Sequence, residues 1–358
     1  MPARRPLRPA ALLLALGLTG LAPAARALDI VLTDTGSTPM SAQQFAALQT
    51  AAGYWESRIG DKVTVYLSVS FSDLGANVLA STRSDKVTID YTDLRSRLAT
   101  DASSAVDASA VAHLQAGPAL SFVATQGDLS TRLDNDGSAN NRLLYLHSAN
   151  AKALGLTTVN DAGTPDARIS FANAFAGSFA YDRVDGHIPA GQTDFITVAE
   201  HEMGHALGFY SGVDDIDFCV DHAAQCGTST GAGRFEDAPW YFPLDLFRYS
   251  APGTLNVAVG GNPLPYFSVD GGATAIESFS SGAAHGNGAQ ASHFGIGSPT
   301  LMQPYVADGA SYDASPADLM ALDAIGWNLT TPVPEPQAWA LMLAGLAALG
   351  ARRRRLSA

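Results

Sequence analysis

The sequence predicts an α+β fold in which helices and strands are mixed within one large domain. Residues 42–58 carry apolar side chains at helical spacing, and Ser41 directly before them can cap the first turn. Residues 62–71 place a valine, leucine or phenylalanine at every second position, which is typical of a half-buried strand. A helical and a strand period in such close succession indicate a mixed fold.

Further elements are predicted along the chain. Residues 143–146 and 169–171 are short strand candidates, separated by turns rich in glycine and aspartate. Residues 193–208 have apolar positions at helical spacing and end in a glycine. A last helix is predicted between Ser315, which can cap it, and Gly326, which would end it.

The N-terminal residues 1–27 have the features of a signal peptide. Arginines precede an apolar run from Pro9 to Leu21, and the small residues of Ala25-Arg26-Ala27 form a cleavage pattern before residue 28. The run is shorter than the ~20 residues that a membrane-spanning helix needs, which disfavours a permanent anchor.

Residues 331–358 form a second targeting segment. Val333-Pro334-Glu335-Pro336 is followed by an apolar segment, residues 338–351, and then by four arginines. This order resembles the PEP-CTERM sorting signal of Gram-negative bacteria. The resemblance implies a short transmembrane segment in transient contact with the inner membrane, and a sorting protease that removes the tail. The mature chain would then lie in the periplasm, on the cell surface or in the extracellular matrix; a permanent anchor is the alternative.

The charge of the chain restricts its partners. The formal net charge is −13, and the two targeting segments contain eight of the arginines, so their removal would make the protein more acidic still. Nucleic acids and anionic membranes would repel such a surface, and neither is expected as a partner.

Cys219 and Cys226 are the two cysteines of the chain. In an oxidising compartment their close spacing predicts one local disulfide that closes a short loop. Two free thiols, or a metal site that includes cysteine, are the alternatives.

The predicted helix at 193–208 contains the motif His201-Glu202-Met203-Gly204-His205. On a helix His201 and His205 lie one turn apart on the same face, so that both imidazoles can bind one zinc ion. Glu202 lies at the neighbouring edge, where its carboxylate can take a proton from an attacking water without binding the metal. The motif predicts a zinc-dependent hydrolase with Glu202 as the general base.

The third zinc ligand does not follow directly. In short-spaced metzincins it stands six residues after the second histidine, and this chain has Ser211 there. The sequence resembles instead the leishmanolysin-like metzincins, in which a long insertion separates the helix from Ala-Ser-His293-Phe and Leu-Met302-Gln-Pro. The resemblance covers residues 193–327 and is shared with exported bacterial metalloproteases that carry PEP-CTERM tails. It implies that His293 is the third ligand and that Met302 forms a tight turn below the imidazoles.

The same resemblance implies a metzincin-like zincin fold in residues 28–330. A mixed-sheet upper lobe, about 28–210, would carry the active-site helix. An irregular lower lobe, about 211–330, would carry the Met-turn and the C-terminal helix.

His293 is also favoured without the family. Of the eight histidines, it alone is followed within ten residues by a Leu-Met-x-Pro turn. Asp214 is the next candidate ligand, followed by His222 and His285.

Two acidic stretches are weaker candidates for calcium sites. Asp134-Asn135-Asp136-Gly137 resembles the start of a calcium loop but lacks the glycine at its sixth position. The second stretch contains Asp214, Asp215, Asp217 and Asp221. Both this stretch and the one with Asp134, Asp136 and Ser138 are interpreted as solvated acidic loops, with calcium binding as the weaker alternative.

The function predicted is a secreted zinc endopeptidase that acts on proteins or peptides. Substrate would lie extended along an edge strand at residues 168–173. Tyr305 is a weaker candidate for an oxyanion donor, because its offset from Met302 differs from that of families which use such a tyrosine. The alternatives are an exported surface or matrix-binding domain with a structural zinc, and a zinc hydrolase with a substrate other than peptides.

Overall fold

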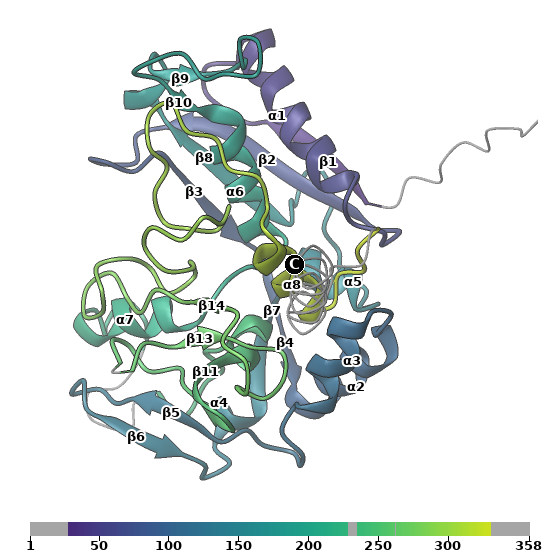
Figure 1. The fold of residues 1–358 in the computed structure, drawn as a ribbon, viewed down its shortest axis with the longest axis vertical. Coiled ribbons are helices and arrows are strands. Elements are labelled where there is room, and N and C mark those ends of the chain that lie inside the picture. The colour runs from purple at the N-terminus through teal and green to yellow at the C-terminus, as the bar shows by residue number, and fades with distance from the viewer. Residues whose placement is uncertain (1–27, 228–234, 262, 331–358) are drawn as a thin grey trace, which may run out of the picture.

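A four-stranded mixed sheet organises the upper half of the molecule in Figure 1. The computed structural model describes residues 28–227, 235–261 and 263–330. Within the sheet β3 pairs antiparallel with β8, and the other strands are parallel to one another. Among the described residues no strand pairs with the other side of β3, which therefore forms a free edge. The strand order is β1 (Asp29–Asp34), β2 (Thr64–Ser72), β8 (Ala167–Ala172) and β3 (Ala80–Ser84).

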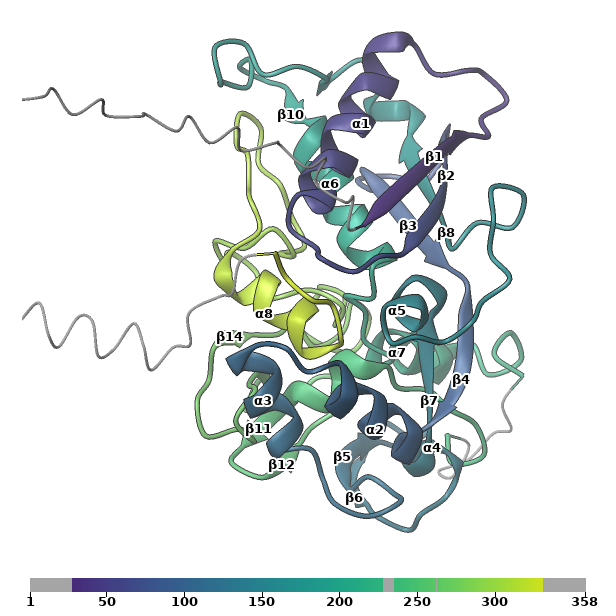
Figure 2. The same ribbon diagram turned by 90° about the vertical axis from the view of Figure 1, so that its right-hand side faces the viewer.

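Two helices cover one face of this sheet, α1 (Ala42–Glu56) and α6 (Phe195–Ala206). Figure 2 shows them side by side. The predicted cap is confirmed, because the Ser41 side chain accepts a hydrogen bond from the backbone N–H of Gln44. Trp55 is fully buried between the helices, and its indole N–H donates to the carbonyl of Glu200 at 2.9 Å. The first predicted helix therefore fixes the position of the second.

The remaining elements are short, and many of them lie in the lower half of Figure 1. β4 pairs with β7, β5 with β6, β9 with β10, and β12-β11-β13-β14 form a small sheet. Their bounds are α2 (Tyr91–Asp101), α3 (Ala105–Ala112), α4 (Ala139–Arg142), α5 (Ser148–Ala153), α7 (Val213–Asp221), α8 (Pro316–Ala324), β4 (Lys86–Asp90), β5 (Phe122–Thr125), β6 (Thr131–Asp134), β7 (Leu143–His147), β9 (Phe179–Ala180), β10 (Thr193–Asp194), β11 (Arg248–Ala251), β12 (Thr254–Leu255), β13 (Tyr266–Phe267) and β14 (Glu277–Ser278), with short 3₁₀ turns at Asn173–Phe175 and Pro243–Phe247. The described residues thus form a mixed α+β fold with eight α-helices and several sheets.

The strands predicted at 143–146 and 169–171 are confirmed as β7 and β8. The expectation that residues 168–173 form an edge strand is wrong, because β8 lies between β2 and β3. β3 was not predicted, since Ala-Ser-Thr-Arg-Ser has no apolar alternation. A polar edge strand buries little surface and therefore leaves no hydrophobic period in the sequence.

The acidic stretch after Gly212 is helix α7 and not a solvated loop. Asp217 is only 3% exposed, and its carboxylate accepts hydrogen bonds from the backbone N–H groups of Ala284 and His285 at 2.8 and 2.9 Å. Asp217 therefore holds a distant backbone segment in place. The predicted disulfide between Cys219 and Cys226 is confirmed and joins the last turn of this helix to the following loop.

Helix α8 begins and ends as predicted. Ser315 caps it through the backbone N–H of Asp318, and Gly326 after it has a positive φ of 104°. The neighbouring Trp327 is fully buried and donates its indole N–H to the carbonyl of Leu207 at 2.6 Å, beyond the end of α6. None of the helices in the described ranges is long and apolar enough to cross a membrane. The predicted signal peptide and sorting tail lie outside these ranges.

Candidate metal centre

Three histidine side chains converge beside helix α6. His201 and His205 lie one turn apart on α6, and His293 comes from a loop 88 residues after His205. The Nε2 atom of His201 lies 3.0 Å from that of His205 and 3.1 Å from that of His293, and the third Nε2–Nε2 distance is 3.3 Å. The structure therefore brings together the three histidines that the sequence singled out.

The other ring nitrogen of each histidine faces a backbone carbonyl. The Nδ1 atom lies 2.8 Å from the Leu301 oxygen in His201, 2.7 Å from the Phe209 oxygen in His205 and 3.2 Å from the Gln290 oxygen in His293. A carbonyl can only accept, so each Nδ1 carries the proton and donates it. Each Nε2 is then left with a lone pair directed at the other two.

Burial keeps these rings neutral. It lowers the pKa of His201 to about 4 and the pKa of His293 to about 3, in the latter case together with the nearby His201. The pKa of His205 is also well below its ordinary value, first because of burial and then because of the other two histidines. Three neutral lone pairs that face one another cannot hydrogen-bond among themselves, and a bound cation would satisfy all three.

The spacing fits a zinc ion. With Zn–N bonds of about 2.0–2.1 Å and tetrahedral angles, the nitrogens of a zinc site lie about 3.3–3.4 Å apart. The three Nε2–Nε2 distances of 3.0 to 3.3 Å are close to this separation. Carbonyl acceptors on the outer nitrogens, as found here, are the usual way in which proteins orient zinc-binding histidines. Imidazoles from these three residues could thus hold one zinc ion.

Met302 packs directly below helix α6. A Cβ atom placed on Gly204 would lie 2.6 Å from the Met302 sulfur, so a glycine is needed at this close approach. Asp318 at the start of α8 fixes the turn, because its carboxylate accepts from the backbone N–H groups of Leu301 and Met302 at 2.9 and 3.0 Å. The turn at Met302 therefore packs against α6 at Gly204 and is held in place by Asp318 of α8. Since the carbonyl of Leu301 also orients His201, one short segment supports both.

Asp214, the second candidate ligand, serves a different purpose. Its carboxylate accepts from the backbone N–H groups of Ala291 and Ser292, at 2.5 and 2.9 Å, directly before His293. Ser211, at the position where short-spaced metzincins have their third ligand, is also engaged elsewhere: it is buried and donates its hydroxyl to Asp245 at 2.5 Å. Asp214 thus positions the loop that carries the third histidine.

The remaining candidate histidines are elsewhere. The ring of His222 stacks on Phe218 with 4.1 Å between centroids, and His285 Nε2 lies 2.9 Å from a carboxylate oxygen of Asp221. Neither belongs to the histidine cluster among the described residues.

Glu202 lines the same cavity as the three histidines and is 6% exposed. The hydroxyl of Thr82, on strand β3, donates to its carboxylate at 2.7 Å. Burial raises the pKa of Glu202 to about 7, while the hydrogen bond from Thr82 acts in the opposite direction. Thr82 was not predicted, because a threonine in a polar strand 120 residues before the motif gives no recognisable signal.

A cavity of about 1230 Å³ opens in front of the histidines. Strand β3 forms one wall. Next to its pairing with β8, the N–H of Ala172 donates to the carbonyl of Leu79, and the N–H of Asp85 donates to the carbonyl of Asp166. In this register the backbone N–H and C=O groups of every second residue, counted from Leu79, point toward β8. The backbone N–H and C=O groups of Ala80, Thr82 and Ser84 therefore point to the free edge.

An aromatic group forms another wall. His147 contacts Tyr210 and Phe242 with ring centroids 5.2 and 5.0 Å apart, and all three line the cavity. His147 Nδ1 lies 3.3 Å from the carbonyl of His205, and burial lowers the pKa of His147 to about 4. In the sequence this histidine gave no sign of lying near the motif. Tyr305 also lines the cavity but is 56% exposed, with its hydroxyl donating to the carbonyl of Gly288 at 3.3 Å.

Comparison with known proteins identifies the C-terminal segment. Residues 332–355 match the PEP-CTERM protein-sorting motif. The protein is therefore exported by a Gram-negative bacterium and sorted to the cell surface or the extracellular space. No curated protein and no solved structure matches the chain.

Proposed function

We propose that the chain is a secreted zinc-dependent endopeptidase of the metzincin type. The observation that carries this proposal is the meeting of three neutral imidazole lone pairs beside a buried glutamate in an open cavity. A site that only needed to hold metal for stability would close its fourth position with protein and would have no use for the carboxylate.

The chemistry would be metal-assisted hydrolysis of a peptide bond. A zinc ion bound by three neutral nitrogens retains most of its charge and would polarise both a water molecule and the scissile carbonyl. Glu202 would accept the proton of the attacking water and deliver it to the departing amine. The hydroxyl of Thr82 would hold the Glu202 carboxylate in one orientation during both transfers.

The free edge of β3 would position the substrate. Because the backbone groups of Ala80, Thr82 and Ser84 point to the free edge and these residues line the cavity, an extended peptide could add to the sheet as a further strand. Backbone pairing of this kind accepts many side chains, which suits an endopeptidase that acts on unfolded segments.

The second candidate is an exported surface or matrix-binding domain whose zinc is structural. What favours it is the sorting motif, which directs the protein to the cell surface or beyond. Against it, the cluster contains three histidines and no fourth acidic, histidine or cysteine ligand among the described residues.

A sorting protease and transient membrane contact remain part of the proposal for the tail.

The deciding experiment is cleavage of an unfolded protein by the mature chain, with and without a chelator. Cleavage should require zinc, and Glu202→Gln should lower kcat/KM by about 10²- to 10⁴-fold while the zinc content stays at one per chain. Glu200→Gln is the matched control. Glu200 stands two residues earlier on α6, does not line the cavity, and has a pKa raised by burial to about 8, so the amide resembles its protonated form.

The outcomes separate the candidates. Zinc binding without any cleavage by the parent chain would favour the structural-zinc domain. Equal cleavage by the Glu202 variant and the parent would refute the assigned general base.

A further inference from the structure

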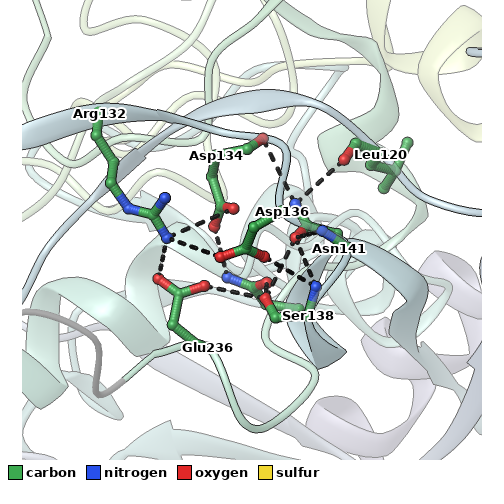
Figure 3. A network of polar contacts seen from close by, with 9 residues as sticks. Leu120, Arg132, Asp134, Asp136, Ser138, Asn141 and Glu236 are labelled. Atoms are coloured by element: carbon green, nitrogen blue, oxygen red, sulfur yellow. Dashed lines mark hydrogen bonds and ion pairs between the residues drawn. The ribbon is translucent and has the colours of Figure 1, made fainter.

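Three carboxylates meet beside β6 and α4, in the lower half of Figure 1, and Figure 3 shows them from close by. They form a group separate from the three histidines. Asp134 ends strand β6, Asp136 comes next in the turn before α4, and Glu236 belongs to a segment about one hundred residues later. One oxygen of each lies within 4.8 Å of the others. The backbone N–H of Asn140 donates to the carbonyl of Glu236 at 3.2 Å, which holds the two segments together.

One nitrogen atom stands at the centre of this acidic cluster. The Nη2 atom of Arg132 lies 3.5 Å from Asp134 Oδ1 and 3.6 Å from Asp136 Oδ2, and it also hydrogen-bonds the carboxylate of Glu236. Figure 3 shows the guanidinium facing all three acids. Three negative groups thus share one positive charge, and a doubly charged ion at the same point would neutralise more of them than the guanidinium does.

Asp134 is the most deeply buried acid of the cluster, and only one of its two carboxylate oxygens accepts a hydrogen bond. Asp134 is 1% exposed; its Oδ2 accepts from Asn140 Nδ2 at 2.9 Å, but its Oδ1 has no hydrogen-bond donor and only the 3.5 Å ion pair. A buried carboxylate oxygen without a donor is costly.

A second observation also favours a cation at this place. Three acceptor oxygens surround the hydroxyl of Ser138: Asn140 Oδ1 at 2.7 Å, Glu236 Oε2 at 3.0 Å and Asn141 Oδ1 at 3.2 Å. A hydroxyl has one proton and can donate to only one of them. Asn141 Oδ1 also accepts from the backbone N–H groups of Gly137 and Ser138, but a surplus of acceptors remains.

We propose that this cluster binds a calcium ion at the position taken by the Arg132 guanidinium. Its donors are all oxygens, which hard cations prefer. Two oxygens on opposite sides of a calcium ion lie about 4.6–5.2 Å apart, consistent with carboxylate oxygens within 4.8 Å of one another. Asp134, Asp136 and Ser138 alternate as in the first half of a calcium loop, and Glu236 supplies the acid that such a loop carries near its end.

Calcium would tie the hairpin of β5 and β6 to the segment after Glu236. That segment leads to Phe242, which lines the cavity in front of the histidines. The ion would therefore stabilise one wall of the cavity without taking part in the chemistry there.

The test is calorimetric titration with CaCl₂ of the mature chain, freed of metals and reloaded with one equivalent of zinc. One calcium should bind per chain with a Kd below about 1 mM, the weak end for extracellular sites, and should raise the thermal unfolding midpoint. Asp136→Asn should weaken calcium binding at least about tenfold, because it removes a charged ligand. Asp128→Asn, which neutralises an exposed acid in the same hairpin, should bind as the parent does.

Arg132→Gln tests whether the guanidinium competes with the ion, and this variant should bind calcium at least as tightly as the parent. The unfolding midpoint without calcium shows whether each variant is folded. The proposal is overturned if the parent binds no calcium at about 10 mM, or if Asp136→Asn and the parent bind equally. Weaker binding by Arg132→Gln would refute the shared position.

Discussion

The histidine cluster and the acidic cluster hold their polar groups together in opposite ways. His201, His205 and His293 are neutral, and each is oriented by a backbone carbonyl behind it. The acidic cluster has three charged groups, and an arginine side chain occupies its centre. The rings of the first group are held in place by these carbonyls, although their Nε2 lone pairs face one another. The second needs a counter-charge at all times.

This difference predicts which metal each cluster prefers. Neutral nitrogen donors at short range suit zinc, whereas charged oxygen donors suit calcium. It also predicts how each cluster responds to damage. The histidine cluster should fail when its geometry is disturbed, and the acidic cluster when its charge is altered.

The largest effect is expected from removal of the distant histidine. His293→Ala should weaken zinc binding by more than about 100-fold, which exceeds the loss typical of an outer hydrogen-bond partner. Competition with a chromogenic chelator measures the affinity. His285→Ala is the matched control, since His285 comes from the same stretch of chain but contacts Asp221.

Equal zinc affinity in the His293 variant and the parent would show that the three nitrogens do not share an ion.

A smaller effect is expected from the packing below the histidines. Gly204→Ala places a Cβ atom 2.6 Å from the buried sulfur of Met302, and should lower the free energy of unfolding by about 1–2 kcal/mol. Gly53→Ala makes the same change in α1, where a Cβ atom would have nothing within 4 Å. It should stabilise the protein by about 0.5–1 kcal/mol, because alanine favours the helix.

Urea unfolding of both variants gives the two free energies. Opposite signs are the expected result. A stabilising Gly204→Ala would mean that the helix and the turn at Met302 are packed more loosely than the structure shows.

Local patterns explain which parts of this molecule could be predicted from its sequence. The cap at Ser41, the alternation in β2, the pair His201 and His205 and the end of α8 at Gly326 each depend on residues within a few positions of one another. In each case the pattern and the structure agree.

The contacts that complete the two clusters are of another kind. Thr82 reaches Glu202 across 120 residues, Asp214 holds the backbone before His293, and Glu236 joins Asp134 from a distant segment. Their residue types are common, and only the tertiary fold brings them together. The loop prediction for α7 is wrong for the same reason, since its aspartates serve backbone groups far along the chain.

A third group of carboxylates is formed by Asp61, Asp101, Asp107 and Asp323, and here protonation, not a cation, reduces the negative charge. Burial, and then the neighbouring acids Asp107, Asp101 and Asp61, raise the pKa of Asp323 to about 7, and burial raises that of Asp101 to about 6. Ser104 donates to Asp323 at 2.6 Å, but the other oxygen of Asp323 has no hydrogen-bond partner. This group sits between α3 and α8 and should make stability depend on pH.

The direction of these pKa shifts gives the sign of the dependence. Well below pH ~4 the acids are protonated in both the folded and the unfolded chain, so they do not change the free energy of unfolding. As the pH rises from about 4 to about 7 the unfolded chain ionises first, and the folded state loses stability. The protein should therefore be less stable at pH 8 than at pH 5.5, by about 1 kcal/mol or more from this group.

Asp323→Asn should flatten this dependence, while Asp90→Asn, an exposed helix cap whose side chain makes no cap hydrogen bond, should leave it unchanged. Urea unfolding of both variants and the parent across this pH range isolates the contribution of the group. A steeper loss in the Asp323 variant would mean that its carboxylate is ionised and stabilising in the folded state. These acids would then resemble the cluster around Arg132, in which a positive charge and not a proton balances the carboxylates.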